Sequence, residues 1–183
     1  MSRPERFDAF AILFHWLVAG LIVANVLIAW SLDNFDRHDP VHDKILTVHK
    51  SIGVVILLLA ALRLAWRWTH PAPLLPETMP RWMRFAAQAD QVVLYAILFI
   101  MPVTGLIDAG GFSEPVNFFF LFELPPLIGH DEPLGHAAMA VHKATAWVLY
   151  ILLALHAAAA LFHHYVLKDQ ILRRMLPLPR PPR

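Results

Sequence analysis

The sequence predicts an all-α integral membrane protein that folds as a four-helix bundle. Hydrophobic residues make up 58% of its 183 residues and charged residues only 16%, whereas ordinary globular proteins have roughly 45–50% and about 25%. The mean hydropathy of +0.54 agrees with this. Four long apolar stretches supply the helices, because about 20 mostly apolar residues cross a hydrocarbon core of about 30 Å.

The first predicted span covers about residues 10–31 and begins FAILFHWLVAGLIVANVLIAW. Basic residues precede it, as in a signal peptide, but it has no A-x-A cleavage site and its apolar run is longer than usual, so we expect a retained helix. The second span covers about 47–68 and is most apolar at 51–62. The third covers about 86–107 and contains Asp90 and Pro102, and the fourth covers about 136–163 and is rich in alanine and leucine.

The remaining segments predict one membrane domain with a short tail. The 108–135 segment holds FFFLFELPPL, which is apolar but too short and too interrupted to span, so we expect it at the outer interface. The domain then covers 1–175, and a Pro-rich cytoplasmic tail covers 176–183. The chain has no cysteine, which excludes disulfides, iron–sulfur clusters, thiolate catalysis and covalent haem attachment.

The basic residues predict the orientation of the bundle. Lysine and arginine favour the cytoplasmic side of a membrane protein. With both termini in the cytoplasm, eleven of the fifteen basic residues lie on that side, and the outer side holds nine of the fourteen acidic residues. We therefore expect the N-in, C-in orientation.

Four of the eleven histidines lie inside predicted spans: His15, His49, His142 and His156. An ionisable residue inside a membrane is a functional candidate, although a lone histidine often makes only an interhelical hydrogen bond. His142 and His156 are 14 residues apart, about 3.9 turns and about 21 Å along one helix, so they share a face at two depths. Depth pairs His15 with His156 on the cytoplasmic side, and His49 with His142 on the outer side.

Two facing imidazoles without a third protein ligand suit the axial positions of a haem better than a tetrahedral zinc site. Small residues that leave room for a porphyrin lie four positions from each histidine: Ala19, Gly53, Ala146 and Ala160. Lys50 and Lys143, next to two of the histidines, could reach haem propionates or could simply extend to the interface. Arg63 and Arg67 leave the same two interpretations open on the inner side.

These segments resemble the bacterial cytochrome b561 family over nearly the whole chain. The resemblance is carried by Phe14-His15-Trp16, Val48-His49-Lys50-Ser51-Ile52-Gly53, Leu62-Arg63-Leu64-Ala65-Trp66-Arg67, Met101-Pro102-Val103-Thr104-Gly105 and Leu155-His156-Ala157-Ala158-Ala159-Ala160-Leu161 followed by His163-His164-Tyr165. The last segment, with Lys168-Asp169 and Leu172-Arg173-Arg174-Met175, is similar to the superoxide oxidase type of this family.

The resemblance implies a four-helix protein of the bacterial inner membrane with two b haems. Its axial ligands would be His15 and His156 for the cytoplasmic-side haem and His49 and His142 for the periplasmic-side haem. The superoxide oxidase type implies an oxidoreductase that passes electrons from periplasmic superoxide to ubiquinone. Lys50 and Lys143 would then lie on the side that superoxide or the propionates approach.

A quinone site is expected on the cytoplasmic side. His163 lies seven residues beyond His156, on almost the same face and about 10 Å nearer the cytoplasm. It could donate a hydrogen bond or a proton to a quinone carbonyl, and the resemblance supports that role. Trp16 could stack on the haem or the quinone, or it could belong to the interfacial belt of aromatic residues.

Two other functions stay open. The outer loops carry a net charge of −5, from four bases and nine acids, which suits a basic protein better than anionic superoxide. The chain would then be a cytochrome b subunit that relays electrons between a periplasmic redox protein and the quinone pool. A third function is zinc handling by His38, His42, His49, His130 and His136. We expect membrane lipid around the bundle and no nucleic-acid partner.

Overall fold

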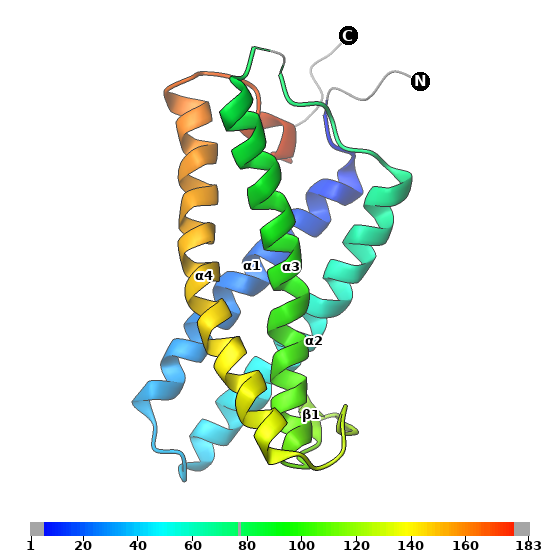
Figure 1. The fold of residues 1–183 in the computed structure, drawn as a ribbon, viewed down its shortest axis with the longest axis vertical. Helices are drawn as coiled ribbons and strands as arrows, with labels where there is room; N and C mark the ends of the chain where they lie inside the picture. Colours follow the sequence, from blue (N-terminus) through cyan, green and yellow to red (C-terminus); the bar gives the residue numbers. More distant parts are fainter. Residues whose placement is uncertain (1–5, 77, 178–183) are drawn as a thin grey trace.

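The computed structural model describes residues 6–76 and 78–177, and Figure 1 shows its fold. The described residues form four long helices: α1 (Ala9–Ser31), α2 (Pro40–Thr69), α3 (Arg81–Gly111) and α4 (Glu132–Tyr165). Each is long and apolar enough to cross a membrane, so the predicted four-helix bundle is confirmed. Of the predicted tail, residues 178–183 lie outside the described residues.

Three of the helices begin where an aspartate caps them, so they extend beyond the apolar spans. The side chains of Asp8, Asp39 and Asp131 accept hydrogen bonds from Ala11, Val41 and Leu134. Such caps satisfy backbone N–H groups that the first helical turn leaves without partners. As a result α2 begins at Pro40 and α4 at Glu132, several residues before the predicted spans.

The helices run lengthwise beside one another (Figure 1). Packing joins α3 to α4, α1 to α2, and α2 to α3. A small core of Val18, Ile52, Ile56, Ala60 and Leu98 lies where α1, α2 and α3 meet. The end of the bundle at which α1 begins and α4 ends is called here the terminal end. The opposite end, which carries the segment between α3 and α4, is called the hairpin end.

The segment between α3 and α4 contains a β-hairpin that the all-α prediction omitted. Strands β1 (Val116–Phe118) and β2 (Phe122–Leu124) are antiparallel, with Asn117 opposite Glu123. The turn between them places Phe119 and Phe120 at φ values of 49° and 62°. Turns of this kind normally use glycine or asparagine, so the sequence carries no turn signal here.

A fully buried serine fixes the hairpin to α2. Ser51 is 0% exposed. Its Oγ lies 2.7 Å from the Thr47 carbonyl of the same helix and 3.2 Å from the Asn117 carbonyl of the hairpin, and it accepts the backbone N–H of Phe119 at 2.9 Å. Because Ser51 follows His49 by two residues, the hairpin is attached next to one of the intramembrane histidines.

Candidate functional site

The structure brings the four intramembrane histidines together in two pairs. The rings of His15 on α1 and His156 on α4 have centroids 6.2 Å apart. Those of His49 on α2 and His142 on α4 have centroids 6.3 Å apart. These are the pairs that depth predicts, and α4 contributes one histidine to each.

The separation within each pair fits an iron atom between the rings. A metal–imidazole bond is about 2.0–2.1 Å long and the ring centroid lies about 1.1 Å beyond the bonded nitrogen, so two rings on opposite sides of one iron have centroids about 6.3 Å apart. The observed separations of 6.2 and 6.3 Å match this value. Both pairs therefore have the spacing of bis-histidine haem ligands.

The helices that carry each pair stand apart from one another. Within the described residues, α4 packs along α3 but far less on α1 or α2, although its histidines face those two helices. A Cβ atom added at Gly20 or at Gly53 would meet no other atom within 4 Å. Because Gly20 is itself exposed, the open space that bears on a histidine is the one beside Gly53, one turn after His49 on α2.

Two of the histidines have the hydrogen bonds expected of metal ligands. His142 donates from Nδ1 to the Met101 carbonyl at 2.9 Å, since a carbonyl oxygen only accepts. The Nδ1 atom of His156 lies 2.7 Å from the Asp90 carboxylate. A proton held on Nδ1 leaves Nε2 free to bind a metal, and metal-ligating histidines usually donate to such groups.

The other two histidines have different neighbours. Nδ1 of His15 lies 3.3 Å from the Arg63 guanidinium. An arginine only donates, so iron binding through Nε2 of His15 requires the ring proton to move to Nδ1 and Arg63 to turn to another acceptor. Nδ1 of His49 is buried beside the backbone of Asn25, short of a hydrogen bond. The surroundings of His142 and His156 therefore fit haem ligation more closely.

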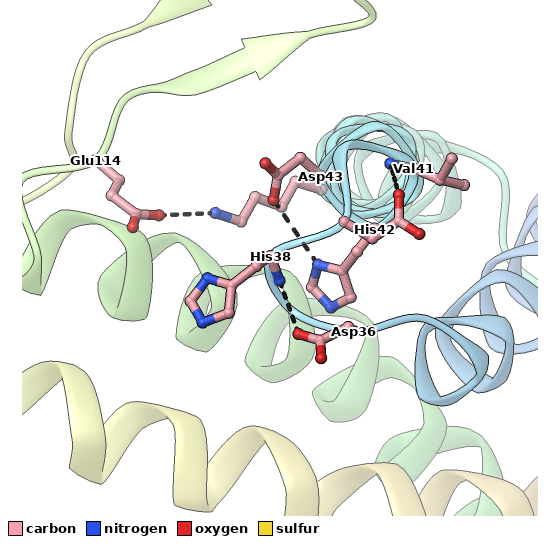
Figure 2. A network of polar contacts seen from close by, with 8 residues as sticks. Asp36, His38, Val41, His42, Asp43 and Glu114 are labelled. Carbon is pink, nitrogen blue, oxygen red and sulfur yellow. Dashed lines mark hydrogen bonds and ion pairs between the residues drawn. The ribbon is translucent and has the colours of Figure 1, made fainter.

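The two lysines suggested for the outer side differ in their surroundings. Lys50 pairs with Glu114, with 3.3 Å between its Nζ and a carboxylate oxygen. Lys143 is exposed, and the described residues give it no ion pair. Figure 2 shows Glu114 near the start of α2, where Asp43 lies, with Asp36 in the loop that precedes this helix. The proposed roles of both lysines toward superoxide or propionates stay predictions.

His163 and Trp16 lie at the terminal end, under the segment that follows α4. Nδ1 of His163 is 2.5 Å from the Asp169 carboxylate, and its side chain is largely buried. The Trp16 indole donates to the Met175 carbonyl at 2.7 Å, and its edge meets the His15 ring with 5.2 Å between centroids. Their roles toward a quinone stay predictions.

Sequence reasoning missed the partners of these histidines. In the sequence Asp90 stands out only as a charge within the third apolar span, although a carboxylate inside an apolar stretch is itself a sign of function. Asp169 was noted only as part of a motif. The Met101 carbonyl could not be found from residue types, because it is a backbone group.

The zinc interpretation gains no support from the geometry. Among the residues that the structure describes, no group of three or more histidine, cysteine, aspartate or glutamate side chains is placed to hold a metal ion. His38 lies in the loop before α2, where its backbone N–H donates to Asp36, and His42 lies in the first turn of α2, with its Nδ1 3.8 Å from the Asp43 carboxylate (Figure 2).

The chain is similar to known proteins over almost its whole length. The family model for prokaryotic cytochrome b561 matches residues 6–178. Cytochrome b561 homolog 2 of Escherichia coli is 30% identical over 176 residues, which cover 96% of this chain and 93% of the relative. The probable superoxide oxidase CybB of Yersinia pestis is 30% identical over 181 residues, covering 96% and 98%. Cytochrome b562 of Cereibacter sphaeroides is 25% identical over 183 residues, with the same coverage.

These matches agree with the four apolar helices and with the spacing of the paired histidines. The chain therefore belongs to the prokaryotic cytochrome b561 family, multi-pass bacterial membrane proteins that carry haem b and transfer electrons.

Proposed function

We propose that this protein moves electrons across the bacterial inner membrane through two b haems, from periplasmic superoxide to ubiquinone. The observation that supports it most strongly is the presence of two histidine pairs at different depths, with ring separations of 6.2 and 6.3 Å. The terminal end faces the cytoplasm, following the excess of basic residues on that side. The relative named probable superoxide oxidase supports the choice of superoxide.

The histidines hold the haems in this proposal. His49 and His142 ligate the periplasmic-side haem, and His15 and His156 ligate the cytoplasmic-side haem. Each haem supplies one-electron chemistry when it is bound. The Met101 carbonyl and the Asp90 carboxylate orient the rings of His142 and His156.

The overall reaction balances with a quinone as the acceptor. Two superoxide ions lose one electron each and leave as O₂, while one ubiquinone takes up two electrons and two protons and becomes ubiquinol. In this proposal His163 donates a proton or a hydrogen bond to a quinone carbonyl at the terminal end. Asp169, 2.5 Å from its Nδ1, holds the ring in one orientation so that Nε2 faces away from the carboxylate.

Superoxide must approach the hairpin end, where positive charge would attract it. Lys50 is the basic residue beside His49, but its charge is offset by Glu114. Lys143, beside His142, is exposed and carries no such offset in the described residues. We therefore expect Lys143 to attract superoxide more strongly than Lys50, and Glu114 to slow its approach.

The test is to mix the oxidised protein with superoxide without oxygen and to follow the haem absorbance, with and without ubiquinone. The proposal expects fast haem reduction that slows as salt is added, followed by oxidation only when ubiquinone is present. Glu114→Gln should speed the reduction, and Lys143→Gln should slow it. Reduction that is slow and becomes faster with salt would contradict superoxide as the donor.

A second candidate is an electron-transfer subunit that receives electrons from a basic periplasmic protein. The acidic segment between α1 and the first turn of α2 supports it, since Asp33, Asp36 and Asp43 are all exposed there. A purely local role accounts for some of these acids, because Asp36 and Asp39 accept backbone N–H groups there. Substituting Asp33 and Asp43 together with asparagine should slow reduction by a basic redox protein and leave reduction by superoxide equal or faster.

A further inference from the structure

Asp90 is a carboxylate within a helix that crosses the membrane, and the electron-transfer proposal does not by itself require it. Charged side chains in this position are costly unless they are paired. The side chain of Asp90 is 21% exposed, and its partner is His156, with 2.7 Å between the carboxylate and Nδ1. Among the described residues no lysine or arginine forms an ion pair with Asp90. The nearby Arg67 is bound to Gln91 instead.

The two histidines of α4 therefore donate to groups of different charge. His142 donates to a backbone carbonyl, at 2.9 Å, and Thr104 Oγ1 lies 3.3 Å from the same nitrogen. Both of these neighbours are neutral. His156 donates to a carboxylate at a shorter distance. The same type of ligand on the same helix is thus given a full negative charge at one depth and only dipoles at the other.

We propose that Asp90 is a positioning residue that lowers the reduction potential of the haem held by His15 and His156. The inference rests on the proposed ligation by these two histidines. A carboxylate on Nδ1–H draws the proton toward itself and makes Nε2 a more basic, more electron-donating ligand. Ferric iron carries one more positive charge than ferrous iron, so a donating ligand and a nearby negative charge both favour the oxidised state.

A cation on the other ligand opposes this effect. Arg63 lies 3.3 Å from Nδ1 of His15, so the pair has a carboxylate on one ring and a guanidinium on the other. Asp90 lowers the potential relative to a neutral residue at its own position, whatever Arg63 contributes. The measurement therefore compares variants at position 90 and does not compare the two haems with each other.

The alternative role for Asp90 is purely structural, as a hydrogen bond that joins α3 to α4. Asp90→Asn separates the two roles because the amide oxygen of asparagine still accepts from Nδ1–H, while the negative charge is lost. The purified full-length protein with its haems is titrated potentiometrically in nanodiscs, and its haem content is measured by the pyridine haemochrome assay. Asp108→Asn is the matched control, since it removes the same charge from the other end of α3.

The expected result is a higher potential for the His15/His156 haem in Asp90→Asn, with the other haem unmoved. Asp90→Glu should restore a potential near that of the wild type, and Asp108→Asn should leave the His15/His156 haem unmoved. Loss of this haem in Asp90→Asn but not in Asp90→Glu assigns the carboxylate to haem retention and also overturns the proposal. An unchanged potential in Asp90→Asn, or loss of this haem in both variants, overturns it. A wild-type protein without haem at His156 overturns the proposed function instead.

Discussion

Ser51→Ala should open the β-hairpin without unfolding the bundle. In the native protein the Oγ of Ser51 accepts the Phe119 N–H at 2.9 Å and lies 3.2 Å from the Asn117 carbonyl. Alanine removes both contacts, and because residue 51 is 0% exposed, no water can replace them. A buried N–H without an acceptor costs about 1–3 kcal/mol, and a cost of about 2 kcal/mol raises the open population about 30-fold.

Hydrogen exchange of the Phe119 amide measures this opening directly. Ser31→Ala is the matched control, because the Ser31 hydroxyl donates only to the Ile28 carbonyl of its own helix, at 2.7 Å. It should change exchange at Phe119 by less than about twofold, since such local bonds contribute little. Equal protection of Phe119 in Ser51→Ala and in the wild type would refute the view that one serine fixes the hairpin.

Four further substitutions test other parts of the site. His163→Ala should leave both haem spectra intact and slow haem oxidation by ubiquinone, and Asp169→Asn should have the same effect but more weakly. Unchanged oxidation kinetics in both variants would show that the quinone binds elsewhere. Lys143→Gln should lower the rate of reduction by superoxide by less than about tenfold, and the loss should shrink with added salt; a rate that rises would mean that Lys143 does not attract superoxide. Gly53→Leu should weaken haem binding at the His49/His142 site by about 1–3 kcal/mol, because the new side chain enters the open space beside Gly53. Full haem content by the pyridine haemochrome assay would show that this space does not face the haem.

The fold could be predicted where one physical rule dominates. Apolar length alone identifies four membrane helices, and helical rise alone places His142 and His156 at two depths on one face. The helix ends were harder, because α2 begins at Pro40 only through the cap from Asp39. That cap extends the helix into a charged segment, which hydrophobicity does not detect.

The hairpin and the partners of the histidines depend on tertiary contacts. Phe119 and Phe120 adopt positive φ values without glycine, and the Ser51 hydroxyl accepts the Phe119 N–H. The contact between Asp90 and His156 joins residues that are 66 positions apart. Sequence spacing reports periodicity within one helix but not which faces of two helices meet. The histidine pairing was accessible because depth, unlike facing direction, is set by position along each span.

Electron transfer as proposed requires the four histidines to hold two haems in the pairs His15 with His156 and His49 with His142. Haem content and potentiometric titration of the four single alanine variants test this claim directly, with the exposed loop residue His130→Ala as the control. Each ligand variant should fall from about two haems per chain to about one, and the two variants of a pair should lose the haem of the same potential. The control should keep both haems. If His15→Ala and His49→Ala lost the same haem, or if all four variants kept two, the central claim would be wrong.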